Sequence, residues 1–140
     1  MDLDKIFNLF SKEYDVNDDT SLLIDFSEHP LYWIGGFNKL INSHLFFTQY
    51  TVKTFKNISP DINIKELEAA GEELMFRKAW GYIKFIDLNK TFHVECLKNK
   101  ASEDFIENLQ VAILFFEGLE EYEKCALLKG IQDKIKEFLK

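Results

Sequence analysis

Two runs of apolar residues at helical spacing, both within residues 102–140, constrain the fold more than any other feature of this chain. Ser102 stands where an N-cap belongs, and Glu103 and Asp104 place negative charge in the first turn that follows. Gly118 interrupts the pattern near the end of the first run, where a chain reversal costs little. The pattern predicts a helical hairpin, with one stripe through Phe105, Leu109, Ala112, Phe116 and Leu119 and the other through Cys125, Leu128, Ile131, Ile135 and Phe138.

The first arm of this hairpin is apolar on every side between residues 111 and 116, so we expect other elements to cover it all round. The remaining composition agrees with helices. The 140 residues are 46% hydrophobic and include fourteen Phe, but only two Pro and six Gly. A core of this size with few turn residues favours an all-α fold. We predict a single domain over residues 1–140, built as a bundle of five to six helices.

For the first 25 residues the sequence predicts one helix and one acidic loop. Leu3, Ile6, Phe7, Phe10 and Tyr14 share a helical face. The loop that follows, residues 15–21, begins with carboxylate and amide side chains at alternate positions, as calcium-binding EF-hand loops do. The glycine and the glutamate that such a loop requires are replaced by Thr20 and Phe26, so we expect no calcium site.

A long apolar stretch from residue 31 to residue 55 predicts a helix, with Ser27 as its cap and Pro30 in its first turn. Gly35 and Gly36 leave two interpretations open: a helix–helix crossing that only glycine permits, or a break between two helices. Close packing is favoured, because flanking aromatic residues would fill such a contact. The stripe runs through Trp33, Phe37, Leu40, Ile41, Leu45, Thr48 and Val52.

Ser59 and Pro60 mark the strongest break in the chain. Asn63 with Glu66 then resembles a capping box, and the helix that it opens is predicted to extend to about Leu88. Thr91 is predicted to cap a short helix over the next few residues.

Charge and hydropathy narrow the classes of partner. The formal net charge of −7 opposes binding to nucleic acid through counterion release, although Lys129, Lys134, Lys136 and Lys140 form a local basic group. No apolar run is long enough to cross a bilayer, and the acidic first residues do not form a secretion signal. We therefore expect a cytoplasmic protein that binds no membrane, with Cys96 and Cys125 as reduced core residues.

No catalytic constellation emerges from the sequence. His93 and Cys96 share one helical face, but no second closely spaced pair of metal ligands completes a site, so His93 is expected to be partly exposed and Cys96 buried. The Gly35–Gly36 pair lacks the residues of a phosphate-binding loop. The sequence predicts no catalytic residue, no metal and no cofactor, and hence no enzyme.

The candidate interface residues are aromatic residues and the single arginine. Glu73 precedes Arg77 by four residues, the favourable order for a helical ion pair, and Arg77 and Trp80 are spaced to stack. Trp, Tyr and Arg are the residue types enriched at interface hot spots, but such side chains on an amphipathic helix more often form the core. The candidates are Tyr32, Trp33, Phe37, Arg77, Trp80 and Tyr82.

Residues 120–131 resemble the second half of a UVR-type helical hairpin. An acidic and aromatic entry at residues 120–123 is followed by the small pair Cys125–Ala126, then Leu128–Lys129 and Ile131, while Gly130 departs from the pattern. The resemblance implies a protein–protein docking element. The lysine-rich composition, with Arg77 as the only arginine, is similar to that of small helical proteins from Bacteroidetes and their tailed phages, which would imply a virion or connector component.

Together these features favour a non-enzymatic helical protein that binds a protein partner, or itself, through an aromatic face. Two alternatives stay open. One is a small-ligand or enzymatic pocket near Trp80, Tyr82 and His93, and the other is a nucleic-acid-associated protein with a local lysine face.

Overall fold

The computed structural model describes residues 26–61 and 63–140, and this part of the chain is all-α. The predicted helix over residues 3–14 and the loop with calcium-like spacing lie outside the described residues. The described elements are a 3-10 turn η2 (Phe26–Glu28) and the helices α2 (Pro30–Ile58), α3 (Ile64–Ile83), α4 (Thr91–Asn99), α5 (Glu103–Gly118) and α6 (Tyr122–Phe138).

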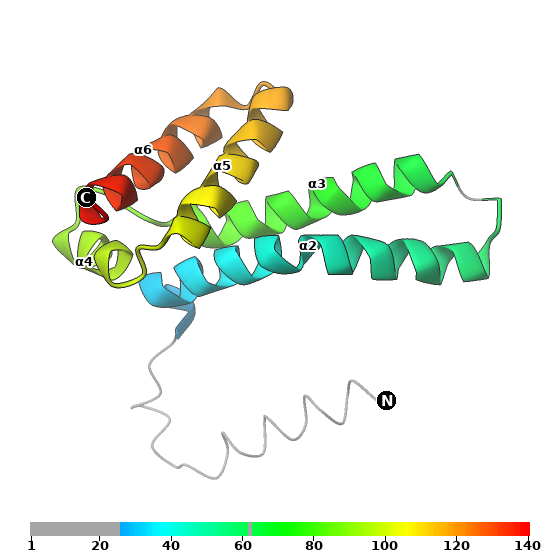
Figure 1. Ribbon diagram of the computed structural model, residues 1–140, viewed down its shortest axis with the longest axis horizontal. Coiled ribbons are helices and arrows are strands. Elements are labelled where there is room, and N and C mark those ends of the chain that lie inside the picture. Colours follow the sequence, from blue (N-terminus) through cyan, green and yellow to red (C-terminus); the bar gives the residue numbers. More distant parts are fainter. Residues whose placement is uncertain (1–25, 62) are drawn as a thin grey trace, which may run out of the picture.

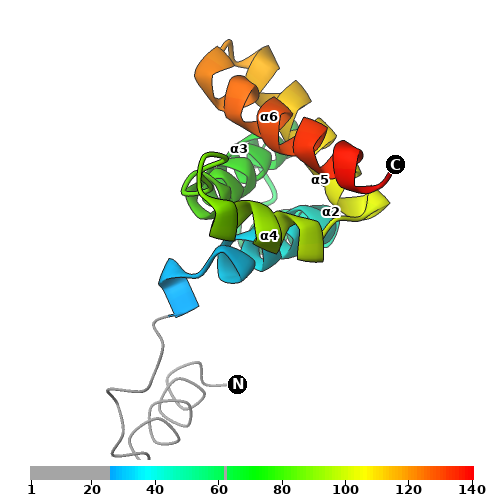
Figure 2. The same cartoon turned by 90° about the vertical axis from the view of Figure 1, so that its left-hand side faces the viewer.

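Two antiparallel helical hairpins make up the architecture (Figure 1). The long helices α2 and α3 lie side by side, and α5 pairs with α6 in the second hairpin, as the sequence predicts. The second hairpin covers only the end of the first that holds the start of α2, and α4 lies at this end, in contact with both α2 and α6 (Figure 2). The other end, formed by residues 44–58 of α2 and 64–74 of α3, projects beyond the bundle, and we call it the arm.

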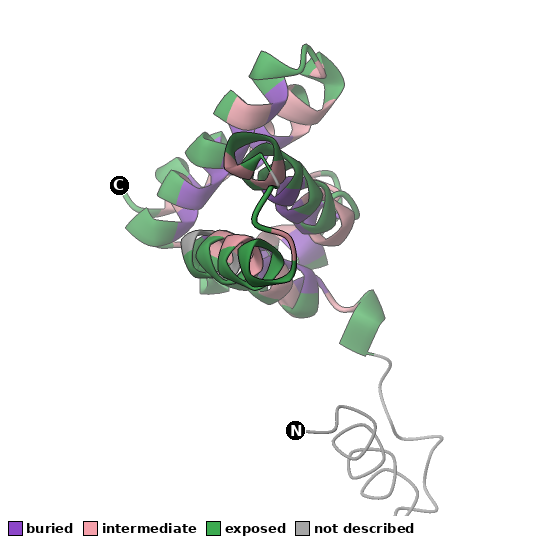
Figure 3. Cartoon of the chain, turned by 90° about the vertical axis from the view of Figure 1, so that its right-hand side faces the viewer, coloured by how far each residue is buried: buried purple, intermediate pink, exposed green. Residues whose placement is uncertain are grey.

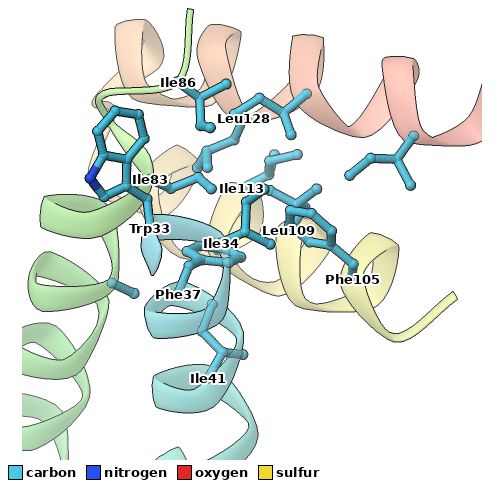
Figure 4. Close-up of a cluster of buried hydrophobic side chains, with 14 of the residues drawn as sticks. Trp33, Ile34, Phe37, Ile41, Ile83, Ile86, Phe105, Leu109, Ile113 and Leu128 are labelled. Carbon is cyan, nitrogen blue, oxygen red and sulfur yellow. The ribbon is translucent and has the colours of Figure 1, made fainter. Parts of the chain in front are cut away.

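The hydrophobic core lies where the two hairpins meet (Figure 4). Both predicted stripes of residues 102–140 contribute to it, although Leu119 at the end of the first stripe is exposed. Burial is concentrated in the bundle, whereas the arm, seen from its free end in Figure 3, is largely exposed. The most deeply buried large side chains include Ile34, Phe37, Phe76, Ile83, Leu97, Phe105, Leu109, Phe116, Leu128, Ile131 and Ile135.

Helix α2 runs without interruption past Gly35 and Gly36, so the predicted close packing is confirmed and the alternative of a break is wrong. A Cβ atom at Gly36 would lie 2.6 Å from the ring of Tyr82 in α3, whereas one at Gly35 would meet nothing within 4 Å. Of the two glycines, only Gly36 must lack a side chain for α2 and α3 to pack this closely.

Several helix ends confirm their predicted caps. The side chain of Asn63 accepts hydrogen bonds from the backbone N–H groups of Lys65 and Glu66 at 3.1 and 3.4 Å. The Ser102 hydroxyl accepts one from the N–H of Phe105 at 3.1 Å. Both side chains satisfy backbone donors that the first turn of a helix leaves unpaired.

Other helix ends differ from prediction. His29, not Ser27, caps α2, because its Nδ1 atom accepts from the Leu31 N–H at 3.1 Å. Helix α3 ends at Ile83 rather than near Leu88, since the chain turns there and buries Ile86. Thr91 is the first residue of α4, so it lies one position too late to act as its cap.

The prediction that Gly118 forms the reversal between α5 and α6 is wrong. Gly118 is the last residue of α5, and the left-handed backbone position falls on Glu120, with φ of 59°. The N–H of Glu121 bonds to the carbonyl of Phe116 at 2.9 Å, and that of Glu120 to Glu117 at 3.0 Å. This is the Schellman pattern, with a glutamate where glycine is usual.

The prediction that residues 111–116 are covered on every side is wrong. Val111 and Leu114 are exposed, because α5 is packed on one side only, by α6 and the ends of α2 and α3. The buried stripe of α5 is as narrow as that of an ordinary amphipathic helix.

Candidate protein interface

Two of the six candidate interface residues, Trp33 and Phe37, are core residues. Phe37 is almost fully buried and packs against Phe105 with ring centroids 6.1 Å apart. Trp33 is also buried, and its indole N–H donates to the carbonyl of Ser27 at 2.6 Å. Neither side chain can reach a partner in this structure, because both lie between the helices of the bundle.

Tyr32 and Tyr82 form an edge-to-face pair between α2 and α3, with ring centroids 5.5 Å apart. Tyr82 is half-buried, and its ring lies over Gly36, so it belongs to the helix crossing. Tyr32 is exposed. Exposed Phe26, Phe85 and Phe92 lie at the same end of the bundle, at the start of α2 and around α4.

Arg77 connects α3 to the start of α6. Its guanidinium donates to the Glu73 carboxylate at 3.0 Å, as predicted, and in bidentate fashion to Glu121 at 3.1 and 3.3 Å. Glu121 also pairs with Lys124, and these two cations, Lys124 first, hold the pKa of the Glu121 carboxyl below its usual range. The same hydrogen bond to Glu121, followed by that to Glu73, raises the pKa of Arg77.

The predicted stacking of Arg77 on Trp80 is replaced by a different cation–π contact. The ammonium of Lys124 lies 5.7 Å from the ring of Trp80 and 5.5 Å from that of Phe116. Trp80 is half-buried and packs edge-on against Phe116. Arg77 and Trp80, both in α3, thus bind side chains of the second hairpin and hold it against α3.

Of Trp80, Tyr82 and His93, only Trp80 lines an open depression of about 570 Å³, which it forms with residues 120–124 and Leu127. His93 is buried, not partly exposed as predicted, and its Nδ1 atom accepts from the Asp87 N–H at 2.9 Å. Burial, followed by the charge of Lys90, lowers the pKa of His93, so its neutral form fits this position.

The two cysteines are free thiols, and Cys96 is a core residue as predicted. Burial raises the pKa of both thiols, which favours the unreactive protonated form. Cys125 packs at the hairpin crossing, where its Sγ atom lies 3.5 Å from the carbonyl oxygen of Ile113. Within the described residues no three His, Cys, Asp or Glu side chains come together in an arrangement able to hold a metal ion.

The aromatic side chains with the highest exposed fractions among the described residues lie on the arm, and they are not among the six candidate interface residues. Phe46 is 75% exposed and Tyr50 is 65% exposed, four residues apart on α2. Lys53 lies seven residues after Phe46, and Lys39 lies seven residues before it, just outside the arm, so that all four share one helical face. We call this the α2 face. It points away from α3, because the side of α2 that meets α3 carries His44, whose ring contacts Phe76.

A simple signal in the sequence could have found these residues. Phe46 and Tyr50 fall off the stripe that runs through Ile41, Thr48 and Val52, and lie on the opposite side of the same helix. A second apolar face on a helix indicates a second contact beyond the one with the core.

The first half of α3 presents a contrasting surface, which we call the α3 face. Ala69 and Ala70 are exposed there, beside the carboxylates of Glu66 and Glu73. This face points away from α2, because Gly71 and Met75, on the other side of the helix, are buried. The first ten residues of α3 carry four Glu and one Lys, whereas α2 contains three Lys and neither Asp nor Glu.

Comparisons with protein families, with curated proteins and with solved structures find no match for this chain. The resemblance of residues 120–131 to a UVR-type hairpin therefore stays a prediction, although these residues do form the turn and first half of the second helix of a hairpin. None of the described helices combines the length and the apolar character that a bilayer crossing demands.

Proposed function

We propose that this protein is a non-enzymatic interaction or structural protein that binds a protein partner through its arm. The exposed α2 face carries the proposal. Two large aromatic side chains stand in solvent on a helix whose opposite side already packs on α3. Exposed aromatic residues grouped on one face are typical of protein-binding surfaces.

The arm also has the form of a binding element. It projects beyond the bundle, so a partner can approach it without displacing the core (Figure 1). Further exposed apolar residues, Phe55 and Ile58, continue to its tip. Helical anchors at a spacing of three or four residues are the usual way in which one helix is recognised by another.

The candidate residues of the bundle are less suited to bind a partner than the arm, because most of them already make contacts within the chain. Arg77 and Trp80 are held by contacts within the chain, and Trp33 and Phe37 are buried. Tyr32 is exposed, but its ring packs edge-on against Tyr82. Within the described residues the rings of Phe46 and Tyr50 pack against no other aromatic ring, so the arm is the better binding surface.

Site-specific photo-crosslinking in the native host tests the proposal. A photoreactive phenylalanine analogue replaces Tyr50, and a matched control carries it at Lys98, which is exposed on α4. We expect a discrete protein adduct from position 50 that is lost when Phe46→Ser is added, and none from position 98. Adducts that are absent at position 50, or unchanged by Phe46→Ser, would contradict the proposal.

A further inference from the structure

The two faces of the arm complement each other in charge and in shape. The α2 face projects Phe46 and Tyr50 between two lysines, and the α3 face offers small alanines beside glutamates. Glu73 of the α3 face pairs with Arg77, whereas in the described residues Lys39, Lys53 and Glu66 form no ion pair within the chain. Their charges are available to a partner of opposite sign, and each face supplies what the other lacks.

We propose that the partner at the arm is a second copy of this chain, with the α2 face of one copy seated on the α3 face of the next. The inference rests on the proposed function and names its partner. The aromatic rings would lie on Ala69 and Ala70, where small side chains let a large one approach, and the flanking lysines would meet the glutamates.

The placement of the faces decides the symmetry of this contact. They lie on opposite sides of the arm, because α2 and α3 pack against each other between them. A contact between two different patches is head to tail, so each copy keeps one unused patch and can bind a further copy. The copies then form a ring or a filament, according to the angle between successive arms.

A symmetric pairing of two α2 faces is disfavoured by the same charges. Lys39 and Lys53 are equally far from Phe46, so an antiparallel pair centred on Phe46 would place each lysine of one copy against a lysine of the other. Like charges brought together in an interface oppose association. The glutamates of α3 remove this repulsion.

The surface area that the two faces can bury is small, so a single contact between two copies is expected to be weak. Many such contacts along an assembly would strengthen it. An aromatic side chain buries roughly 150–250 Å², against about 800 Å² per partner in a standard protein interface. Phe46 and Tyr50 thus supply about half of that area, and the lysine stems, Ala69 and Ala70 add to it. We expect assembly to depend on protein concentration and on ionic strength.

Sedimentation velocity of the full chain, with one face blocked at a time, tests the inference. Phe46→Ser with Tyr50→Ser blocks the α2 face, and Ala69→Arg with Ala70→Arg blocks the α3 face. All four positions are exposed, so circular dichroism and thermal melting should show an unchanged fold. Phe92→Ser, at an equally exposed aromatic residue on α4, is the matched control.

We expect the mass of the wild type and of the control to increase with concentration beyond a dimer, and each blocked variant alone to remain a monomer. A mixture of the two blocked variants should form a dimer and stop there, since only one intact α2 face and one intact α3 face remain. A wild type that is monomeric at every concentration, or a mixture that forms no dimer, overturns the inference.

The crosslink from position 50 separates this failure from that of the proposed function. An adduct with a different protein, together with a monomeric wild type, retains the proposed function and rejects the second copy. An adduct with residues 1–25 of the same chain rejects both, because the α2 face would then be occupied from within.

Discussion

Gly36 of α2 and Tyr82 of α3 meet so closely that a single methyl group does not fit between them. A Cβ atom at Gly36 would lie 2.6, 2.7 and 2.8 Å from three ring carbons of Tyr82. The neighbouring Gly35 is exposed, with open space around its Cα atom. Two adjacent glycines in one helix thus face opposite steric conditions.

This contrast predicts opposite effects of the same substitution. Gly36→Ala should lower the free energy of unfolding by about 1–3 kcal/mol, because the tyrosine ring or the helix must move. Gly35→Ala should raise it by up to about 1 kcal/mol, since alanine favours the helix. Urea unfolding of both variants measures the difference, and equal effects would show that the crossing is not close.

The reversal between α5 and α6 predicts a stabilising substitution at Glu120. A residue other than glycine in the left-handed region destabilises the folded state by roughly 1–2 kcal/mol. Replacing it with glycine removes this strain, but it also stabilises the unfolded state, because glycine has more conformational freedom there. Glu120→Gly should therefore raise the free energy of unfolding by about 0.5–1 kcal/mol. Thermal unfolding is the measurement, and a loss of stability would contradict the observed backbone conformation.

Gly118 provides the matched control for this turn. It is helical, and a Cβ atom added to it meets nothing within 4 Å. Gly118→Ala should be neutral or stabilise by up to about 1 kcal/mol. If Gly118→Ala destabilised the protein and Glu120→Gly did not stabilise it, Gly118 would be the turn residue after all.

Thr48, on the side of α2 that faces α3, has a buried hydroxyl oxygen without a hydrogen-bond partner in the described residues. Valine has nearly the same shape and lacks the polar atom. Thr48→Val should therefore stabilise the protein by about 1 kcal/mol, the lower end of the cost of a buried unpaired polar group. Thr54→Val is the control, because the Thr54 hydroxyl is exposed and donates to the Tyr50 carbonyl at 2.9 Å.

The ion pairs of Glu121 predict a dependence of stability on pH. Lys124 and then Arg77 lower the pKa of Glu121 in the folded protein, so the folded state binds this proton less readily than the unfolded state. Its contribution is fully present above the unfolded pKa of about 4.3 and is lost as the pH falls through the lowered folded value.

Urea unfolding at pH 7 and at pH 3 measures this contribution. Glu121→Gln should be less stable than the wild type at pH 7, and the difference should shrink at pH 3. Glu123→Gln is the control, because Glu123 forms no ion pair in the described residues. A difference between wild type and Glu121→Gln that stays constant with pH would show that the ion pairs do not stabilise the fold.

The sequence predicts which segments are helical better than it predicts where each helix ends and what covers it. Ser102 and Asn63 cap as expected, because a capping bond forms between residues two or three apart and needs no tertiary contact. His29 takes the place of Ser27 at the start of α2, although histidine is not a preferred N-cap residue. The end of α3 is set by the burial of Ile86, a long-range effect that local propensity does not contain.

The candidate site shows the same division. A stripe of apolar residues indicates that a helix has a buried side, but it does not tell how far along the helix the cover extends. Trp33, which packs on His93 of α4, and Phe37, which packs on Phe105 of α5, are buried, whereas Phe46 and Tyr50, farther along the same helix, are exposed. The sequence could not separate them, since the limit of the cover depends on where α5 and α6 dock.

The amino-acid sequence by itself determined that this chain is helical, where α3 and α5 begin and that α5 and α6 close a hairpin, because periodicity and capping act between near neighbours. The tertiary structure decided which aromatic side chains are core and which stand on the arm. It also decided that Arg77 binds Glu121, a residue 44 positions away. Such contacts depend on the packing of whole helices, which no short stretch of sequence specifies.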